Sequence, residues 1–479
     1  MSFSINKISD ISEDKSLVFL VNDLTQLKSS DLSADEMVYI RRKEAADKKN
    51  RRFFINRLNR LVAVLIPDQS IKLNERIEWL RREGAACWNK LKEEGLKQVQ
   101  VVNLTDMKLA GLALAEGLVL GAYSFEKYKS ETKGTLFPEV GLLDEAIALS
   151  QVEELIRVCR AVYLTRDLVN EPVGTLNAVK LGSEVMSLAN QYGFKAEVFN
   201  KAKIEAMKMG GLLAVNQGSI DPPTFTVLEW HPDNAVNSEP YVLVGKGVVF
   251  DTGGINLKTP PGSLDTMKCD MGGAAAVIGA FVAIAANKLP VHVVGLIPAT
   301  DNRPGGNAIV PGDVIKMHNG TTVEVMNTDA EGRLILGDAL SFAANYKPRL
   351  VIDLATLTGN AAIALGEHGT VGMGTADDII MKKLADVGDE VCERVVWFPF
   401  WSDYDDLIKS EVADIKNVGG REGGAITAGK FLSHFVDAPW LHLDIAGPAF
   451  ILKRANYRGI GGTGVGVRLL YHFLKSQSK

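Results

Sequence analysis

Beyond about residue 173, apolar runs rich in β-branched residues alternate with apolar helical stretches. The strand-like runs are Phe225 to Trp230, Tyr241 to Phe250, Val291 to Ile297 and Leu350 to Leu354, and the clearest helical stretch is Gly272 to Ala286. Buried strands covered by helices on both faces produce such an alternation. The pattern therefore predicts an α/β fold in which helices flank a mixed or parallel sheet.

The length of the chain predicts more than one domain. It has 479 residues, of which 46% are hydrophobic, and single cores usually stop growing below this size. Residues 1–150 mix short apolar runs with charged helical stretches, so we expect a smaller N-terminal α/β domain there. From Leu142 to about Val169 apolar residues recur at helical intervals until Pro172. We expect residues 151–172 to be a linker helix and residues 173–479 to be the C-terminal domain.

Charge and cysteine content exclude several classes of protein. The formal net charge of −5 provides no overall basic field for nucleic acid or anionic membranes. The run Arg41 to Arg52 is basic, but Glu44 and Asp47 interleave it at helical spacing, which favours a solvated helix face over a nucleic-acid site. The four cysteines form no CxxC pair, and this favours a reducing cytoplasm over a disulfide framework or a cysteine zinc site.

Neither secretion nor a membrane span is expected. The N-terminus MSFSINKISDISEDKS lacks a charged region followed by an apolar stretch. No later window approaches the roughly 18 uninterrupted apolar residues of a membrane-spanning helix. We therefore expect a cytoplasmic protein.

Lys246 stands in a run, YVLVGKGVVFDTGG, that otherwise predicts a buried strand. A buried ammonium loses several kcal/mol of solvation unless it is paired, and it can instead deprotonate and bind a metal as a neutral amine. When this segment is taken alone, an ordinary ion pair between Lys246 and Asp251 is the favoured interpretation. Asp251 itself leaves the strand at its C-terminal end, where open α/β sheets usually bind ligands.

Three further acidic residues complete a candidate site. Asp270, in MKCDMGGAAA, precedes an apolar helix and by itself would be interpreted as a helix N-cap. In NTDAEGRL, Asp329, Glu331 and Arg333 share parity, so an extended segment would turn them to one side. With Asp251 these residues supply four carboxylates, which tolerate close approach only with cations between them. Such a site suits zinc, manganese or magnesium, and bridging carboxylates can hold two ions about 3.5–4 Å apart for hydrolysis.

Other catalytic signatures are missing from the sequence. It contains no HExxH, no GxSxG, no complete GxxxxGK(S/T) and no GxGxxG after a strand. The seven histidines stand singly, and each is interpreted as a structural or surface residue before a ligand: His231, His292, His318, His368, His434, His442 and His472. The sequence therefore offers no obvious histidine base.

Taken together, these motifs resemble the leucine aminopeptidase family, also called cytosol aminopeptidases. The eight residues NTDAEGRL match the family's signature in full, and VGKGVVFDTGGINLK, MKCDMGGAA, DLATLTG, ADIKN and HLDIAG match further family motifs. The similarity spans roughly Arg166 to Leu470, and the N-terminal portion carries no family motif. The resemblance implies an enzyme that uses two divalent metal ions per subunit to hydrolyse N-terminal amino acids from peptides.

The resemblance also implies a ligand set. The ligands of the tighter ion would be Lys246, Asp251, Asp270 and Glu331, and those of the more exchangeable ion Asp251, Asp329 and Glu331. Asp251 and Glu331 would thus bridge the two ions. Zinc or manganese is implied, with magnesium as an alternative at the exchangeable site.

Two catalytic residues follow from the same resemblance. Lys258 would polarise the scissile carbonyl and stabilise the oxyanion. Arg333, flanked by Gly332 and Leu334, would bind a bicarbonate that acts as general base for a metal-bridged water, the nucleophile. This assignment would explain why no histidine base is found.

Substrate contacts and assembly are implied as well. Thr356, Leu357 and Gly359 would border the substrate, and the pocket for the first side chain would be lined by Met267, Ala446 and Ala449. An apolar pocket favours Leu and other apolar residues, but a methylene is worth only about 1–3 kcal/mol, so selectivity should be broad. Members of the family assemble as homohexamers, two stacked trimers, and we expect the same here.

Two alternatives remain open from the sequence. One is a non-catalytic binding or scaffold protein that retains the fold, because fold does not determine function. The other is a two-metal hydrolase of a different bond, such as a phosphate ester. None of the implied metal-binding or catalytic positions is substituted, and Lys246 together with ATLTG argues against phosphate esters. The sequence therefore favours the aminopeptidase.

Overall fold

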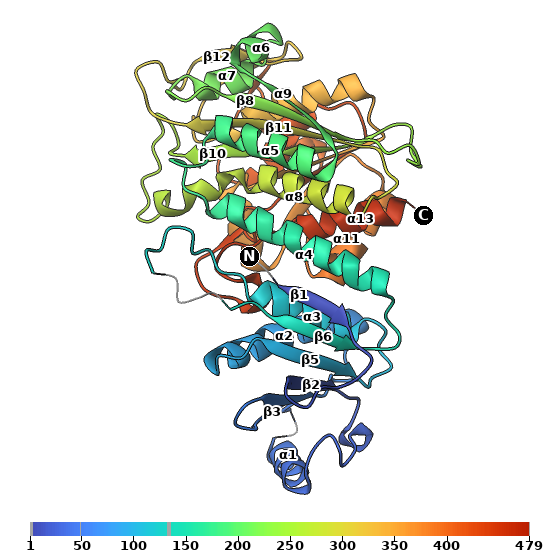
Figure 1. The fold of residues 1–479 in the computed structure, drawn as a ribbon. Coiled ribbons are helices and arrows are strands. Elements are labelled where there is room, and N and C mark those ends of the chain that lie inside the picture. The colour runs from blue at the N-terminus through green and yellow to red at the C-terminus, as the bar shows by residue number, and fades with distance from the viewer. Residues whose placement is uncertain (1–2, 48, 132–135, 479) are drawn as a thin grey trace. The chain divides into compact units, whose positions relative to one another are not determined.

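The computed structural model describes residues 3–47, 49–131 and 136–478 and divides into two compact units (Figure 1). Unit 1 comprises Met1–Arg160 with Lys453–Gly459, and unit 2 comprises Ala161–Leu452 with Ile460–Lys479. The boundary between the units falls within helix α4 (Leu149–Asn170). Nothing in the sequence indicated that Lys453–Gly459 groups with unit 1. The predicted fold class, α/β with a smaller N-terminal α/β domain, is confirmed.

Unit 1 is built on a largely parallel sheet in the order β1-β6-β5-β2-β4-β3, in which only the pair β3 and β4 is antiparallel among the described strands. Its strands are β1 (Ser4–Lys7), β2 (Ser16–Leu20), β3 (Arg52–Asn56), β4 (Leu61–Leu65), β5 (Gln98–Asn103) and β6 (Glu139–Leu143). Every residue of β2 and β4 is buried, as both faces of a parallel sheet require.

The helices of unit 1 are α1 (Ala34–Ala46), α2 (Leu73–Glu93) and α3 (Ala110–Gly121) with the 3₁₀ helices η1 (Leu24–Gln26) and η7 (Asn456–Arg458). Helices α2 and α3 pack at a glycine contact, where a Cβ on Gly117 would lie 1.9 Å from the Arg81 carbonyl oxygen. Helix α1 begins with a capping box between Ser33 and Glu36. Its basic residues Arg41 and Arg42 are exposed, as expected of a solvated face, and Lys48 of that run lies outside the described residues.

Unit 2 contains a mixed sheet in the order β16-β15-β18-β14-β9-β11-β8-β7, with β10 also paired to β11. The central strands β18, β14, β9 and β11 are parallel, whereas β8 and β15 join them antiparallel. The strands are β7 (Lys195–Phe199), β8 (Thr224–Trp230), β9 (Tyr241–Gly245), β10 (Gly247–Asp251), β11 (Val293–Asn302), β14 (Leu350–Ala355), β15 (Thr370–Gly374), β16 (Val395–Trp397) and β18 (Trp440–Asp444).

Helices cover both faces of this sheet, with α5 and α8 on one face and α7 and α9 on the other (Figure 1). The helices of unit 2 are α5 (Ala178–Tyr192), α6 (Lys201–Ala206), α7 (Gly210–Asn216), α8 (Gly272–Ala286), α9 (Gly332–Ala343), α10 (Gly359–Leu365), α11 (Asp378–Val391), α12 (Gly424–Ser433) and α13 (Val467–Gln477). Smaller elements are β12 (Val314–Lys316), β13 (Thr322–Glu324), β17 (Ile415–Lys416), β19 (Phe450–Ile451), β20 (Gly461–Gly462), and the 3₁₀ helices η2 (Leu264–Met271), η3 (Ala344–Tyr346), η4 (Gly366–His368), η5 (Ser402–Tyr404) and η6 (Asp406–Ile408).

Helix α8 has the predicted bounds and is a core helix. In the part of the chain that the structure describes, the stretch Leu264–Ala286 is long and apolar enough to cross a membrane, but its most apolar window is 94% buried inside unit 2. Such burial is typical of a core helix in a globular unit. The apolar composition of α8 is therefore explained by packing against β9 and β14.

The predicted single strand from Tyr241 to Phe250 is wrong at one point, because it is interrupted at Lys246. Strand β9 pairs with both β11 and β14, whereas β10 continues along β11 alone. The Lys246 amide still donates to the Leu354 carbonyl oxygen at 3.1 Å, and its own carbonyl accepts from the Ala274 amide at 2.9 Å. At Lys246 the chain thus leaves β14 and turns its backbone toward the start of α8.

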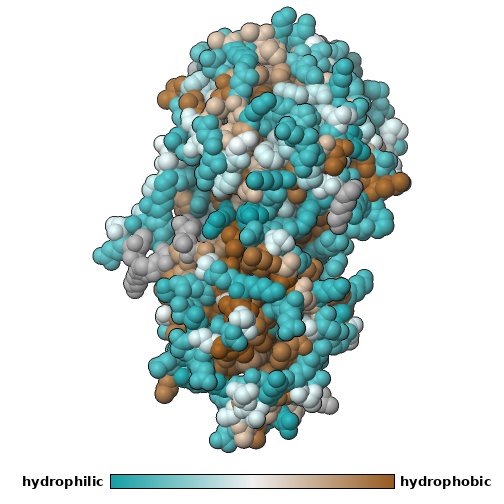
Figure 2. Space-filling model, turned by 45° about the vertical axis from the view of Figure 1, so that its right-hand side comes forward, coloured by the Kyte–Doolittle hydropathy of each residue, from teal (hydrophilic) through white to brown (hydrophobic). Residues whose placement is uncertain are grey.

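Hydrophobic residues are distributed unequally over the surface that Figure 2 presents. They gather on the visible face of unit 1, whereas the visible face of unit 2 is mostly hydrophilic. Contiguous apolar surface of this kind is typical of faces that contact other molecules.

Candidate metal centre

Lys246 lies at the break between β9 and β10, where its side chain is buried. Its ammonium lies 2.8 Å from both oxygens of Asp270, 3.0 Å from Glu331 Oε1 and 3.0 Å from the Thr356 carbonyl oxygen. Its partners are therefore carboxylates distant in the sequence, and the simpler pair with Asp251 does not describe it. Burial lowers the pKa of Lys246, but the neighbouring charges of Asp270, Glu331 and Asp251 outweigh burial and raise that pKa above its ordinary value.

Asp251 ends β10 and is buried. Its Oδ1 accepts hydrogen bonds from the Gly253 amide and from Asn302 Nδ2, both at 2.8 Å. The turn that follows requires glycine, because Gly253 has φ +90° and a Cβ there would lie 2.9 Å from Asp329 Oδ1. The strand end therefore brings Asp251 beside Asp329, as expected for ligand sites at the C-terminal end of a sheet strand.

Asp270 is not the N-cap of the apolar helix that follows it. It lies in η2, and Met271 occupies the N-cap position of α8 without a side-chain cap. The Asp270 carboxylate instead accepts from Lys246 and from Thr356 Oγ1 at 2.8 Å. Burial raises the pKa of Asp270 well above its ordinary value, although the charge of Lys246 opposes this. The carboxylate thus belongs to the charged cluster and not to the helix terminus.

Asp329 and Glu331 converge, but not by the predicted extended geometry. Glu331 has φ −73° and ψ −37° and stands at the N-cap position of α9, so Arg333 already belongs to the helix. Even so, Asp251, Asp329 and Glu331 each offer one carboxylate oxygen within 4.8 Å of the others. These are the three residues expected to bind the exchangeable ion.

Lys258 spans two of these carboxylates. Its ammonium lies 2.7 Å from Asp251 Oδ2 and 2.6 Å from Asp329 Oδ1. Burial lowers the pKa of Lys258, and the charges of Asp251, Glu331 and Asp329 raise it to a larger extent. Burial and the charge of Asp251 together raise the pKa of Asp329 to about 6, which Lys258 partly offsets. Two ammonium groups therefore leave the four carboxylates with an excess of negative charge.

The cluster passes a chemical test for divalent cations. Its donors are carboxylate oxygens and, once an arriving cation displaces the proton of Lys246, one amine, and these suit zinc and manganese. Among the residues that the structure describes, Glu331 Oε2 is buried without a hydrogen-bond partner. A buried, unpartnered carboxylate oxygen is costly unless a cation approaches it. The residues present therefore fit the two ions that the sequence implies.

Arg333 lies in the first turn of α9 and is buried. Its Nη1 donates to the Asn417 carbonyl oxygen at 2.6 Å, whereas its Nε is buried without a partner in residues 3–47, 49–131 and 136–478. Burial lowers the pKa of Arg333 to about 10. Of its neighbours, Leu334 packs in the core and donates its amide to the Glu331 carbonyl oxygen at 2.9 Å.

Gly332 permits the approach of Lys246 to α9. A Cβ at Gly332 would lie 2.4 Å from Lys246 Cε and 2.6 Å from Lys246 Nζ. No real side chain is accommodated at such distances without a shift. The glycine of NTDAEGRL thus serves the packing of a lysine that lies 86 positions earlier in the numbering.

The expected substrate residues fall on segments next to these carboxylates. Thr356 follows β14 and contacts Asp270, and Leu357 donates its amide to Asp444 Oδ1 at 3.1 Å. Gly359 begins α10, and a Cβ added there would meet nothing within 4 Å. The remaining three are Met267 in η2, half-buried Ala446 after β18, and buried Ala449, whose Cβ and Thr356 Cγ2 both lie against Gly272.

Comparison with known proteins identifies the family. The model of the cytosol aminopeptidase family, catalytic domain, matches residues 163–471. The chain belongs to this family. This cytosol aminopeptidase is 46% identical over 384 residues to the probable cytosol aminopeptidase of Chlorobium limicola, a match that covers 76% of this chain and 75% of that protein. The resemblance seen in the sequence is therefore confirmed.

Solved structures give the same result for this aminopeptidase. The bottromycin maturation enzyme BotP in complex with Mn matches with a TM-score of 0.86 and 31% identity, covering 98% of this chain and 100% of that chain. A mutant of tomato leucine aminopeptidase matches with a TM-score of 0.87 and 27% identity, covering 99% and 97%. The protein is accordingly a metal-dependent aminopeptidase, a hydrolase that acts on peptides.

Sequence reasoning missed several residues that position other groups of the aminopeptidase's site. Asn302 at the end of β11 donates to Asp251 and to the Thr328 carbonyl oxygen. Asp444 accepts from the Leu357 amide and from Thr358 Oγ1 at 2.7 Å. Asn417 and Asp444 lie inside the matched motifs ADIKN and HLDIAG, so these motifs could have identified them as site residues. Asn302 lies in no matched motif, and only its place at a strand end pointed to the site.

Proposed function

We propose that this aminopeptidase removes Leu and other apolar N-terminal residues from peptides, with broad preference, using two divalent metal ions. The observation that carries the proposal is the contact of two lysines, buried Lys246 and half-buried Lys258, with four carboxylates. In the described part of the chain one of those carboxylates, Glu331, keeps a buried oxygen unpartnered. Divalent cations that replaced the ammonium contacts would balance the carboxylate charges and give the Glu331 oxygen a partner.

Five residues are assigned to the two metal ions, and two of the five serve both ions. We assign the tighter ion to Lys246, Asp251, Asp270 and Glu331, and the exchangeable ion to Asp251, Asp329 and Glu331. Zinc or manganese fits these donors, with magnesium as an alternative at the exchangeable position; the manganese named for the BotP structure supports manganese. Ions of this kind supply Lewis acidity and a water nucleophile at neutral pH.

Lys258 acts on the substrate in this proposal. Its ammonium is held by Asp251 Oδ2 and Asp329 Oδ1, oxygens that would bind cations in the active enzyme. Once those oxygens have other partners, the Lys258 ammonium can donate to the scissile carbonyl oxygen and stabilise the charge that develops there.

Arg333 binds an anion in this proposal. Its buried Nε has an unused donor, in the region that the structure describes, and it lies at the N-terminus of α9, where the helix dipole favours negative charge. Bicarbonate is the anion that the family resemblance implies, with Gly332 and Leu334 flanking the arginine. Bicarbonate there would supply the general base that accepts a proton from the attacking water.

The substrate would lie between the strand-end segments. Thr356, Leu357 and Gly359 would border the peptide, and the pocket for its first side chain would be formed by Met267, Ala446 and Ala449. The small side chains of Ala446 and Ala449 leave room for an apolar residue. Because a single methylene contributes only about 1–3 kcal/mol, several apolar residues should be accepted.

Assembly and location are part of the same proposal. We expect a homohexamer of two stacked trimers, which a sedimentation experiment would test. The names of the family and of the Chlorobium limicola relative refer to the cytosol, and the four cysteines are buried. These features support a cytoplasmic enzyme, and we propose that its partners are peptides and neither membrane nor nucleic acid.

The test is hydrolysis of leucine p-nitroanilide by protein loaded with manganese or zinc, before and after chelation. Glu331→Gln removes a proposed bridging ligand with little change in volume, and we expect it to abolish release. Glu205→Gln, at an exposed position on α6, is the matched control and should retain activity. No release from any of a panel of aminoacyl substrates would instead support the non-catalytic binding protein, and release from phosphate esters alone would support the phosphoesterase.

A further inference from the structure

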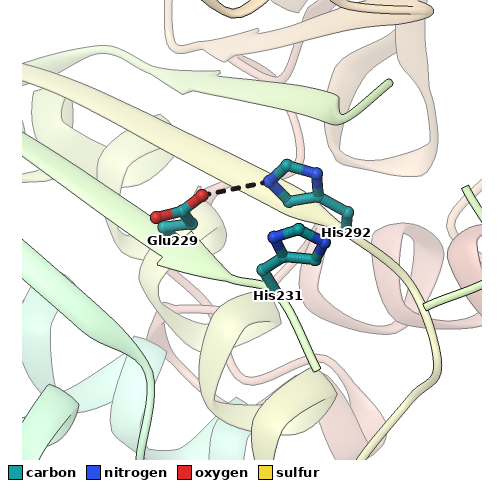
Figure 3. A group of neighbouring side chains, drawn as sticks. All are labelled: Glu229, His231 and His292. Atoms are coloured by element: carbon teal, nitrogen blue, oxygen red, sulfur yellow. Dashed lines mark hydrogen bonds and ion pairs between the residues drawn. The ribbon is translucent and has the colours of Figure 1, made fainter. Parts of the chain in front are cut away.

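A second group of metal-binding side chains lies outside the catalytic cluster. Glu229 is in β8, His231 follows β8, and His292 precedes β11 (Figure 3). Strands β8 and β11 are antiparallel, with Glu229 opposite Val294 and Trp230 opposite Val293. The next pair in this register is His231 opposite His292. Since side chains alternate along a strand, Glu229 and His231 point to the same face, and all three residues share it.

The three side chains are close enough to share one ion. Each offers one ligand atom within 4.8 Å of the others. His292 Nε2 lies 3.1 Å from Glu229 Oε1. The rings of His231 and His292 lie side by side in Figure 3. Their centroids are 3.8 Å apart and their planes are inclined by 8°. His231 is exposed, so its ring can turn about χ2 to direct a nitrogen at the same point.

Both ring nitrogens of His292 lie near oxygen atoms, Nε2 near Glu229 Oε1 and Nδ1 near the Ser238 carbonyl oxygen. Its Nδ1 lies 3.4 Å from the Ser238 carbonyl oxygen, which can only accept a hydrogen bond. When Nδ1 carries the proton of the neutral ring, the lone pair of Nε2 faces a carboxylate oxygen. The contact at 3.1 Å is made either by a ring proton on Nε2 or, in the tautomer protonated at Nδ1, by a metal ion that both atoms bind. Metal-binding histidines usually donate their other ring nitrogen to a carbonyl in this way.

The backbone holds His292 in place. Its amide donates to Asn237 Oδ1 at 2.9 Å, and its carbonyl oxygen accepts from Asn237 Nδ2 at 2.9 Å and from the Tyr241 amide at 3.1 Å. On the neighbouring strand, the Trp230 indole donates to the Leu289 carbonyl oxygen at 2.9 Å. The ligand positions are therefore pre-ordered by contacts that a metal need not create.

We propose that Glu229, His231 and His292 bind one transition-metal ion, for which zinc is the best match, at a site separate from the catalytic centre. Two imidazoles and a carboxylate form a familiar zinc ligand set, with water in the remaining position. The catalytic end of β11 is Asn302 and the histidine end is Val293. At about 3.3 Å per residue, this strand separates the two sites by about 30 Å. The ion joins the end of β8 to the beginning of β11.

The test compares the zinc content of whole proteins equilibrated in the same zinc-buffered solution. His231→Ala is suitable because the side chain is exposed, and His368→Ala is the matched control at another exposed histidine. We expect His231→Ala to bind one zinc ion fewer per chain than the wild type, and His368→Ala to match the wild type. Equal zinc content in the wild type and His231→Ala, or an equal loss in both variants, would overturn the proposal.

A second measurement needs no variant. Diethyl pyrocarbonate modifies accessible imidazoles, and mass spectrometry identifies each modified histidine. Zinc should protect His231 of the wild-type protein several-fold while leaving modification of His368 unchanged. Modification of His231 at the same rate with and without zinc would refute the site.

Discussion

Replacing Gly332 with alanine tests whether the position of Lys246 limits catalysis. The backbone at Gly332 is helical, and alanine is ordinarily favoured over glycine in a helix by up to about 1 kcal/mol. The new methyl group would nevertheless lie 2.4 Å from Lys246 Cε. The lysine cannot simply swing away, since Asp270, Glu331 and the Thr356 carbonyl oxygen hold its ammonium.

The size of the effect follows from the distances. An ordinary van der Waals contact begins at about 3.4 Å, so the end of Lys246 must move by about 1 Å. A 1 Å displacement of a group at an active site can lower the rate about 10²-fold. Such a loss corresponds to about 2.7 kcal/mol of transition-state stabilisation. We therefore expect kcat/KM of Gly332→Ala to fall about 100-fold.

The assay is kcat/KM for leucine p-nitroanilide with enzyme loaded with manganese, together with the metal content and melting temperature of the same preparation. Gly306→Ala is the matched control, because a methyl group there would meet nothing within 4 Å. The melting temperature should remain near that of the wild type, so that the loss is one of activity. A Gly332→Ala enzyme that stays within threefold of the wild type would refute the reasoning.

Two further predictions concern buried polar groups away from the catalytic residues. Burial raises the pKa of Asp338 to about 7, although amides including those of Leu212 and His318 oppose this. Its contribution to stability is therefore complete below its unfolded-state pKa of about 4 and lost as pH rises through about 7. In Asp338→Asn, the melting temperature should therefore change less between about pH 4 and about pH 7 than in the wild type. The free energy of unfolding should also fall by about 1–3 kcal/mol, because one backbone amide loses its acceptor. An unchanged dependence of melting temperature on pH would contradict the assignment. Trp440→Phe removes the indole hydrogen bond to Asp353 Oδ2 at 2.7 Å and should cost about 1.5–3 kcal/mol in denaturant unfolding, and a loss below about 0.5 kcal/mol would count against it.

Much of the fold of unit 2 could be predicted because its strands and helices are buried and locally consistent. Helix α8 has the predicted bounds Gly272–Ala286, and β14 begins at Leu350 as expected. The interruption at Lys246 could not be predicted. Apolar residues continue on both sides of the lysine, and the break arises because β14 stops pairing there while β11 continues. Pairing between distant strands leaves no local pattern in the sequence.

The candidate site was predictable as a set of residues but not as a geometry. The motifs named Asp329 and Glu331 as neighbours of Asp251, and they do converge. The extended segment assumed for them was wrong, because α9 begins at Gly332. Asn302, which holds Asp251 from 51 positions away, could be recognised only after β10 and β11 were paired.

The sequence by itself thus determined the alternation of strands and helices, the family, and the residue types of the proposed metal ligands. Each of these features depends on residues that lie close together in the sequence. Only the tertiary structure decided which groups meet. Lys246 reaches Asp270 and Glu331 because a strand ends beside two helix starts. His231 faces His292 because the register of β8 against β11 places them opposite one another, and a shift of one residue would move them apart.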